Sequence, residues 1–338
     1  MEDMQKVAKT NNYGWLIAAS IIGGIVLACA ILPLGGFALL LGSAGSASST
    51  LATPSSSWSE QTVEGSGLDR IVIIDIAGTI GAGGGGLLSG GLTQEDILSQ
   101  IKQASEDSFV KAVVLRVDSP GGGVVASSEI HAELMKLREA EKRLVVSMGS
   151  TAASGGYYVA TPAERIYANA DTLTGSLGVI LSLVNYEEAF AKIGVESVVY
   201  KSGELKDIGS PTRPATPEEQ EVLQSVVDDA YQGFVDVIAA GRNMPRERVI
   251  ELADGRIYTG KQALDLGLID AIGNLDEAIA GAKELAGLTD ATVVRYTQPD
   301  SLRSLLLSQL SASQDHDPLG VKTLLEQRAP RLEYRWVP

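Results

Sequence analysis

Residues 111–148 read KAVVLRVDSPGGGVVASSEIHAELMKLREAEKRLVVSM and carry the clearest structural signal in the chain. The run 111–117 is short, apolar and rich in valine, which predicts a buried strand. A Pro-Gly-Gly-Gly turn follows it, then a helix over 126–139 and a further strand over 143–148. Because strand, helix and strand alternate, the sequence predicts an α/β fold with largely parallel pairing.

Similar patterns extend this prediction in both directions. The run 70–76 predicts another buried strand, and Thr93 is placed to cap a helix that reaches about residue 104. A long helix is predicted over 217–240, with Pro217 in its first turn. The remaining predicted elements are helices over 245–253, 260–266 and 275–286 and a last strand at Val293-Val294.

Composition excludes several classes of protein. The chain has 338 residues, with 42 Asp and Glu against 27 Lys and Arg, so its formal net charge is −15. Such an acidic protein is a poor nucleic-acid binder, because phosphates would be repelled. Cys29 is the only cysteine, which excludes intrachain disulfides and cysteine-based metal sites. With only His131 and His316, a histidine-rich metal centre is excluded as well.

The N-terminal segment is predicted to cross a membrane. Residues 15–41 carry no charge and would span about 40 Å as a helix, more than a hydrocarbon core of about 30 Å. Lys6 and Lys9 precede this segment and the next basic residue is Arg70, which predicts a cytoplasmic N-terminus and an extracytoplasmic remainder. A cleaved signal peptide is the alternative, because the small residues over 43–47 would suit cleavage.

The predicted organisation has five parts. They are a short cytoplasmic N-terminus (1–14), a transmembrane anchor (15–41), a flexible linker rich in small residues (42–67), a folded domain (68–298) and a loosely held C-terminal tail (299–338).

Two glycine-rich stretches follow predicted strands. Gly81-Ala-Gly-Gly-Gly-Gly86 formally matches the dinucleotide-binding fingerprint, but no helix begins at its third glycine, and we interpret it as a surface loop. Asp118-Ser-Pro-Gly-Gly-Gly123 lies between a strand and a helix, where backbone N–H groups could stabilise an anion or a developing oxyanion. A tight strand-to-helix turn explains the same glycines, and spacing alone leaves both interpretations open.

Ser154 is a hydroxyl with small neighbours that leave it approachable. It lies near a predicted helix start in Met148-Gly-Ser-Thr-Ala-Ala-Ser-Gly-Gly-Tyr-Tyr158. The Gly155 N–H and the positive end of that helix could stabilise charge beside it. A capping serine in a packed turn is the plainer interpretation. Ser176, in the apolar run 172–179, indicates little alone.

A serine nucleophile needs a base, and the sequence offers few. His131 lies well inside a predicted helix and His316 in the polar tail, so neither is well placed. A lysine can serve if burial lowers its pKa enough to give the neutral amine. Lys201 and Lys206 follow a predicted apolar strand over 195–200, and Lys206 lies in a turn-rich stretch that could fold over a cleft.

Five motifs in this order resemble the signal peptide peptidase A family, membrane-anchored Ser-Lys proteases with a ClpP/crotonase-like fold of repeated strand-strand-helix units. The resemblance covers roughly residues 68–290 and is closer to the short, single-domain form of the family. Its motifs are Asp118-Ser-Pro-Gly-Gly-Gly123, Ala153-Ser-Gly-Gly-Tyr-Tyr158, Leu173-Thr-Gly-Ser-Leu-Gly-Val179, Lys201-Ser-Gly-Glu-Leu-Lys206-Asp-Ile and Gly255-Arg-Ile-Tyr-Thr-Gly260.

The resemblance implies a role for each matching residue. Ser154 would be the nucleophile, Lys206 the general base, and Ser176 the hydroxyl that helps to orient the lysine amine. Backbone N–H groups at Gly121 and Gly155 would form the oxyanion hole.

Two further expectations follow from these roles. Lys206 should be largely buried, and its neighbour Asp207 should point elsewhere, since a nearby carboxylate would keep the ammonium charged. An extended peptide substrate would add to strand edges in this region. The residues expected to contact it are Gly122, Gly123, Val124, Leu177, Gly178 and Val179.

The resemblance therefore implies a membrane-anchored serine endopeptidase that cleaves extended apolar peptides, such as signal peptides left in the membrane after secretion. It implies no cofactor, and a ring- or dome-shaped homo-oligomer. The alternatives are a related Ser-Lys protease that cuts one membrane protein partner, a non-proteolytic crotonase-like acyl-CoA enzyme, and an inactive scaffold.

Overall fold

Strands and helices alternate along the chain in a computed structural model that describes residues 58–81, 92–297 and 332–336. The strands are β1 (Ser59–Glu64), β2 (Arg70–Ala77), β3 (Val110–Ser119), β4 (Gly121–Gly123), β5 (Arg143–Ala153), β6 (Arg165–Ala168), β7 (Leu173–Gly175), β8 (Ile180–Leu181), β9 (Ile257–Thr259), β10 (Ala271–Ile272), β11 (Thr292–Thr297) and β12 (Leu332–Arg335). The helices are α2 (Gln94–Glu106), α3 (Val124–Glu139), α4 (Gly155–Tyr158), α5 (Glu187–Lys192), the 3₁₀ turn η1 (Glu204–Asp207), α6 (Pro217–Arg242), α7 (Arg246–Leu252), α8 (Gly260–Asp265) and α9 (Leu275–Ala286).

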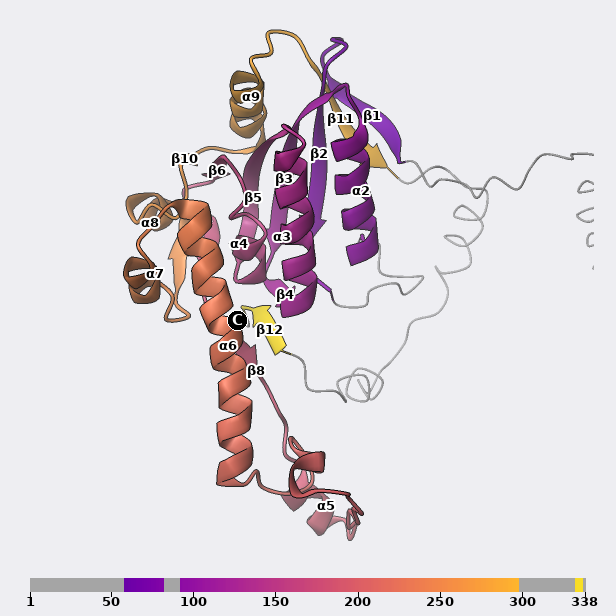
Figure 1. Cartoon of the computed structure of the whole chain (residues 1–338), viewed down its shortest axis with the longest axis vertical. Helices are drawn as coiled ribbons and strands as arrows, with labels where there is room; N and C mark the ends of the chain where they lie inside the picture. Colours follow the sequence, from indigo (N-terminus) through magenta and orange to yellow (C-terminus); the bar gives the residue numbers. More distant parts are fainter. Residues whose placement is uncertain (1–57, 82–91, 298–331, 337–338) are drawn as a thin grey trace, which may run out of the picture. The chain divides into compact units, whose positions relative to one another are not determined.

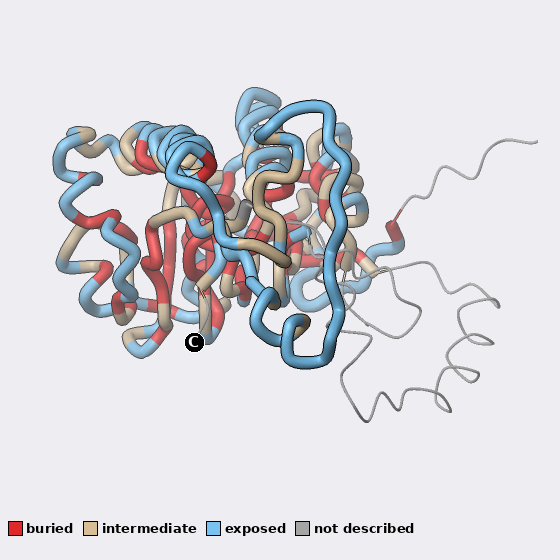
Figure 2. The backbone as a smooth tube through the Cα atoms, turned by 90° about the horizontal axis from the view of Figure 1, so that it is seen from below, coloured by how far each residue is buried: buried red, intermediate tan, exposed pale blue. Residues whose placement is uncertain are grey.

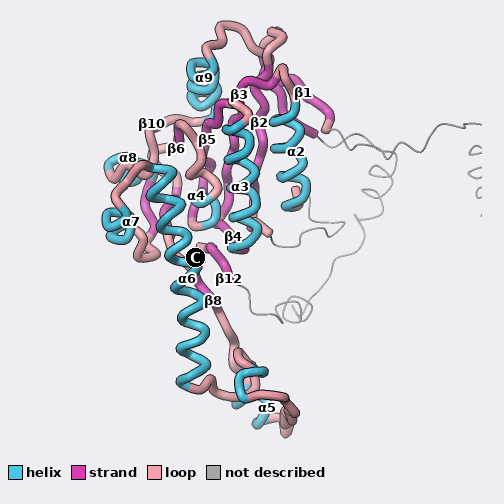
Figure 3. The backbone as a smooth tube through the Cα atoms, in the orientation of Figure 1, coloured by secondary structure: helices cyan, strands magenta, loops and turns pink. Residues whose placement is uncertain are grey.

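A mostly parallel sheet forms the centre of the fold (Figure 3). Its strand order is β1-β11-β2-β3-β5-β6-β10, and β7 pairs with both β5 and β9. Along the main order, each neighbouring pair is parallel except β1 with β11. The predicted α/β class with a parallel sheet is confirmed.

Helices cover both faces of this sheet (Figure 1). Successive strand residues point to opposite faces, so a strand buried on both sides is apolar throughout. In β2, Val72 and Ile74 join a core cluster with residues of α2, α3 and α6, whereas Ile71 and Ile73 join a second cluster with residues of α9. The alternation explains why these runs could be recognised as buried strands from sequence.

The segment predicted as a linker holds an edge strand. Ser59–Glu64 form β1, which pairs antiparallel with β11. Trp58 lies against α2, where its backbone N–H donates to Gln103 Oε1 at 2.7 Å and its indole N–H donates to Ser99 Oγ at 2.8 Å. The folded domain therefore begins at least ten residues earlier than predicted. All side chains of β1 are exposed, so the strand has no hydrophobic pattern to reveal it.

A small second sheet contains the end of the chain. β12 lies between β4 and β8 and pairs antiparallel with both. The prediction of a loosely held tail is therefore wrong for Leu332–Arg335, because two strand edges provide backbone partners for this segment.

We call the segment between β8 and α6 the arm (182–216). It lies at the N-terminal end of α6, which is the end farther from the central sheet (Figures 1 and 2). It carries α5 and η1, neither of which has a buried residue. The strand predicted over 195–200 is absent from the described arm, where these residues have no strand conformation and are exposed. Within residues 58–81, 92–297 and 332–336, no strand pairs with this apolar run.

Among the described residues, no helix combines the length and the apolar composition that a membrane span requires. The predicted anchor at 15–41 lies outside the described residues, as do the glycine-rich loop over 82–91 and the tail over 298–331.

Candidate active site

Ser154 occupies the turn between β5 and α4. It is the N-cap of α4, with φ 53° and ψ −115°, a backbone conformation that costs energy for a residue with a side chain. Its N–H donates to Gly175 O at 2.8 Å, and its carbonyl accepts from Tyr158 N at 2.9 Å. The turn is thus held at both ends and presents the serine in a strained strand-to-helix geometry like that of known serine nucleophiles.

The Ser154 hydroxyl is buried and has no hydrogen-bond partner among the described residues. Ser127 Oγ on α3 shares this property. Leaving a buried hydroxyl unpaired costs on the order of 1–3 kcal/mol, so a fold rarely keeps one without a functional reason. Ser154 is one of four described residues with such an unpaired buried group, together with Gln100, Ser127 and Tyr296, and its role as a nucleophile stays a prediction.

Ser176 lies beside Ser154 because their strands are neighbours. β5 and β7 pair in parallel with Ala153 opposite Gly175, so the next residue of each strand is one of the two serines. Ser176 also has a positive φ of 49°, and its N–H donates to Arg256 O at 2.7 Å. Ser176 lines a cleft of about 480 Å³. Gly178, Val179, Ile180, Tyr231 and Trp336 are among the residues that line it as well.

The glycines of the first motif approach the start of α4. A Cβ on Gly121 would lie 2.6 Å from Gly155 N and 2.0 Å from Tyr334 O, so no side chain could be accommodated there. A Cβ on Gly155 would lie 3.1 Å from both Gly122 N and Tyr334 O and 2.7 Å from Ser127 Oγ. Backbone groups from three segments therefore meet around the Tyr334 carbonyl oxygen.

The Gly121 amide, which was expected in the oxyanion hole, has a hydrogen-bond partner of its own. The Gly121 N–H donates to Ser119 Oγ at 3.1 Å, so in this chain it is already committed to a local bond. The adjacent Gly122, which pairs with Tyr334 in the β4–β12 ladder, brings its amide close to Gly155. The amides of Gly122 and Gly155 therefore lie close together, and the oxyanion-hole role of Gly121 and Gly155 stays a prediction.

The chain's own C-terminal strand lies where an extended substrate was expected. β12 pairs with Gly121–Gly123 on one side and with Ile180–Leu181 on the other. Of the other residues expected to contact substrate, Val124 begins α3, Leu177 is buried, and Gly178 and Val179 line the cleft. The tail shows that the edges of β4 and β8 can hold a peptide between them as an antiparallel strand.

An aromatic pocket receives the Tyr334 side chain. Tyr334 stacks on Tyr158 at 5.1 Å between ring centroids and packs against Phe234 at 4.5 Å, and its hydroxyl donates to Ala230 O at 3.0 Å. His131 packs edge-on against Tyr158. Burial raises the pKa of the Tyr334 phenol and lowers the pKa of the His131 imidazole, so both groups are neutral at pH 7.

Lys206 is not brought to Ser154 within one chain. It lies on η1 and is exposed, whereas Ser154 is buried without a partner. η1 is tied through Asp207 and Arg213 to Glu219 in the first turn of α6. A helix rises 1.5 Å per residue, so Glu219 is about 18 Å along α6 from Tyr231, which lines the cleft beside Ser176. The expected burial of Lys206 is not met in the single chain, because the arm extends away from the cleft.

The Asp207 carboxylate accepts hydrogen bonds from Lys201 and Arg213. Sequence reasoning missed Ser119, Ser127 and Tyr334. Each is an ordinary residue whose position becomes informative only once distant backbone segments are placed around it.

Among the described residues, no group of three or more His, Cys, Asp or Glu side chains is placed to hold a metal ion.

Comparisons of the sequence with known proteins show similarity to serine-type peptidases. The family model described as peptidase family S49 matches residues 136–289. A protein of Enterococcus faecium named as a signal peptide peptidase, SppA, is 43% identical over 240 residues, which cover 70% of each chain. Protease 4 of Salmonella typhi is 40% identical over 215 residues, 64% of this chain and 35% of that protein. The chloroplastic serine protease SPPA of Arabidopsis thaliana is 36% identical over 267 residues, 77% of this chain and 39% of that protein.

Proposed function

The chain belongs to the signal peptide peptidase family of S49 serine peptidases, and from this premise we propose that it is a membrane-anchored endopeptidase that uses Ser154 and Lys206 as a Ser-Lys dyad. The observation that carries the proposal is the Ser154 hydroxyl, which is buried, unpaired and held in a strained turn beside a bound extended strand.

The proposed reaction is acyl transfer. The neutral amine of Lys206 takes the Ser154 proton as Oγ attacks the peptide carbonyl carbon. The amides of Gly155 and Gly122 hold the oxyanion, and the lysine ammonium returns its proton to the leaving amine as the peptide bond breaks. Water then attacks the acyl-enzyme, with the same lysine as base, and releases Ser154. Ser176, at the mouth of the cleft, orients the amine.

In this proposal the lysine comes from a neighbouring copy of the chain. Each arm extends away from its own cleft, and it carries exposed apolar side chains that a second copy would cover. Among them Tyr200 is 94% exposed, Ile193 72% and Val198 67%. A homo-oligomer of ring or dome type would place each arm at the next subunit's Ser154 and bury Lys206 there, which favours the neutral amine.

The proposed substrates are extended apolar peptides, such as remnant signal peptides. The edges of β4 and β8 already hold the chain's own tail as an antiparallel strand beside the cleft, with an aromatic side chain in a neutral pocket. An anchor at 15–41, with the N-terminus in the cytoplasm and the catalytic domain outside, would keep the site next to membrane-embedded peptides.

Complementation between two inactive variants tests the dyad and its subunit origin together. We expect Ser154→Ala and Lys206→Ala each to lower cleavage of an apolar fluorogenic peptide by at least 10³-fold. Mixed subunits of the two variants should regain activity, because some interfaces then pair an intact serine with an intact lysine. Lys192→Ala, which removes another exposed lysine of the arm, is the matched control and should cleave normally. Full activity of either dyad variant would refute the proposal.

Two further measurements separate the alternatives. A serine-directed phosphonate should label Ser154 and no other residue. Cleavage should rise toward alkaline pH as the neutral amine accumulates, and a maximum at acidic pH with collapse above neutrality would contradict a lysine base. A protease restricted to one membrane protein would leave unrelated signal peptides intact.

A further inference from the structure

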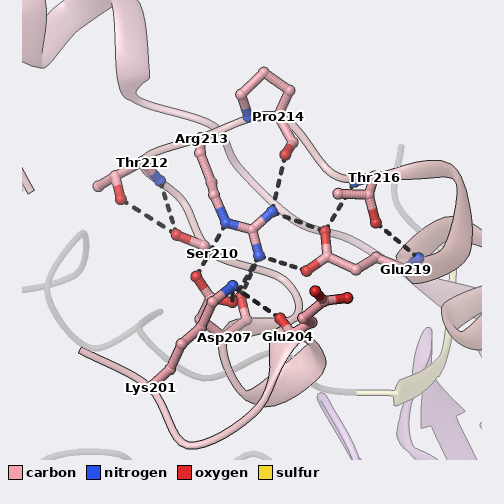
Figure 4. Close-up of polar contacts among 9 residues, drawn as sticks. All are labelled: Lys201, Glu204, Asp207, Ser210, Thr212, Arg213, Pro214, Thr216 and Glu219. Atoms are coloured by element: carbon pink, nitrogen blue, oxygen red, sulfur yellow. Dashed lines mark hydrogen bonds and ion pairs between the residues drawn. The ribbon is translucent and has the colours of Figure 1, made fainter. Parts of the chain in front are cut away.

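The turn that carries Lys206 is fastened by a single arginine that bridges two carboxylates (Figure 4). Arg213 Nε and Nη2 donate to the two Asp207 carboxylate oxygens at 3.0 and 2.7 Å. Its Nη1 donates to Glu219 Oε2 at 2.8 Å, and Nη2 also bonds Glu219 Oε1. The planar guanidinium thus joins η1 to the first turn of α6 by paired, charge-assisted bonds.

Both carboxylates have additional partners that fix them. Lys201 Nζ donates to Asp207 Oδ1 at 2.7 Å and to Glu204 O at 2.8 Å. Glu219 is buried and completes the capping box of α6, accepting from Thr216 N at 2.8 Å. Hydrogen bonds from Arg213, and then from Lys201, hold the pKa of Asp207 well below its usual range. Asp207 is therefore an anion with its charge already matched.

This arrangement leaves Lys206 outside the cluster. In a 3₁₀ turn successive side chains diverge by about 120°, because three residues complete one turn. Asp207 is directed to Arg213, so Lys206 leaves the turn in another direction and is exposed. A carboxylate within about 4–6 Å of a lysine would favour its charged form, which cannot accept a proton. The fastening of Asp207 therefore matters to a lysine that must act as a base.

We propose that Arg213 is a positioning residue for the Lys206 base. It keeps the Asp207 carboxylate directed toward α6 and away from the lysine amine, and it fixes the direction in which the amine leaves the turn. The proposal rests on the proposed function of Lys206. It assigns a role in the reaction to a residue that contacts neither substrate nor the Ser154 hydroxyl.

The other charged groups near this turn determine which control variants the test needs. Lys201, Glu204 and Asp207 lie on or beside η1, and Glu218 and Glu219 lie in the first turn of α6. Glu204 contacts Lys201 through its main-chain oxygen, so its carboxylate is a second acid on the same turn that Arg213 does not hold. Removing Asp207 or Glu204 separately can therefore identify which carboxylate matters.

The test is the pH dependence of kcat/KM for the full-length oligomer with an apolar fluorogenic peptide. We expect Arg213→Gln to raise the pH at which kcat/KM is half-maximal by about one unit. On the rising limb of the profile, this is about a tenfold loss of kcat/KM at a given pH. Arg213→Gln with Asp207→Asn should return the midpoint to the wild-type value, whereas Arg213→Gln with Glu204→Gln should not. Arg165→Gln, which breaks a comparable arginine pair with Glu284 away from the cleft, should leave the midpoint unchanged.

A purely structural role would lower the rate at all pH values without moving the midpoint, and would overturn the proposal. So would a shifted midpoint that Asp207→Asn fails to restore. If Arg213→Gln does not fold, Arg213→Lys keeps the charge but cannot bridge both carboxylates, and its midpoint must still rise. The Lys206→Ala variant distinguishes failure of the proposed function from failure of the role of Arg213. Retained activity would refute Lys206 as the base. Lost activity together with an unchanged midpoint for Arg213→Gln would refute only the role of Arg213.

Discussion

Truncation of Tyr334 should increase cleavage of added peptides, because the chain's own tail occupies the strand edges of β4 and β8 at which an extended substrate is expected to bind. The Tyr334 side chain is 2% exposed and lies between Tyr158 and Phe234. Alanine at this position keeps the backbone pairing of β12 with β4 but removes the group that fills the aromatic pocket. Any substrate that binds in the same cleft competes with this tail.

The expected size of the effect follows from what the side chain buries. Burial of one aromatic side chain contributes about 1.5–3 kcal/mol, its aromatic pairs about 0.5–1.5 and its hydroxyl bond about 1, with some loss for the ordering of the tail. A net loss of about 3 kcal/mol would lower the equilibrium constant for docking of the tail by roughly 100-fold. The apparent KM for a peptide should then fall by between several-fold and about 100-fold, with kcat unchanged.

The assay compares wild type, Tyr334→Ala and Arg335→Ala in hydrolysis of a fluorogenic apolar peptide. The Arg335 side chain is 43% exposed, so its removal should leave KM close to the wild-type value. An unchanged KM for Tyr334→Ala would show that the docked tail does not compete with substrate. An equal fall for Arg335→Ala would show that the aromatic pocket is not the cause.

Three further changes test the fold around the site. Ser154→Gly should abolish cleavage yet raise Tm by roughly 2 °C, because glycine relieves the positive φ and removes an unpaired hydroxyl; a lower Tm in calorimetry would contradict this. Trp58→Ala should cost about 3 kcal/mol in chemical denaturation, since it removes a buried indole and its bond to Ser99, and a cost below about 0.5 would mean that β1 is not part of the domain. Acid should loosen the arm: Arg213 lowers the pKa of Glu219 to about 2 and that of Asp207 below its usual range, so their stabilisation is present above about pH 4 and is lost as pH falls toward 2. The protection of amides 201–219 from hydrogen exchange, relative to the intrinsic exchange rate at each pH, should fall over that window. Protection that does not change with pH would refute the expectation.

Much of the domain could be predicted from local pattern. The Val- and Ile-rich strands β2 and β3, the glycine turn after β3 and the helix α9 each depend on residues within a few positions of one another. Ser154 could also be singled out, since small neighbours at a strand-to-helix junction are visible in the sequence. β1 could not, because its exposed polar residues gain their structure only from pairing with β11.

Local sequence patterns were sufficient to predict the α/β class and the order of most elements, and they drew attention to Ser154 as a candidate nucleophile. Only the folded chain shows that the C-terminal strand lies between β4 and β8, that the Gly121 N–H donates to Ser119 Oγ, and that Lys206 lies on an exposed turn of the arm. Periodicity and turn chemistry depend on residues that are close together in the sequence, so they can be read from it. The partner of a strand edge or of an extended arm can lie far away in the sequence, and only folding brings the two together.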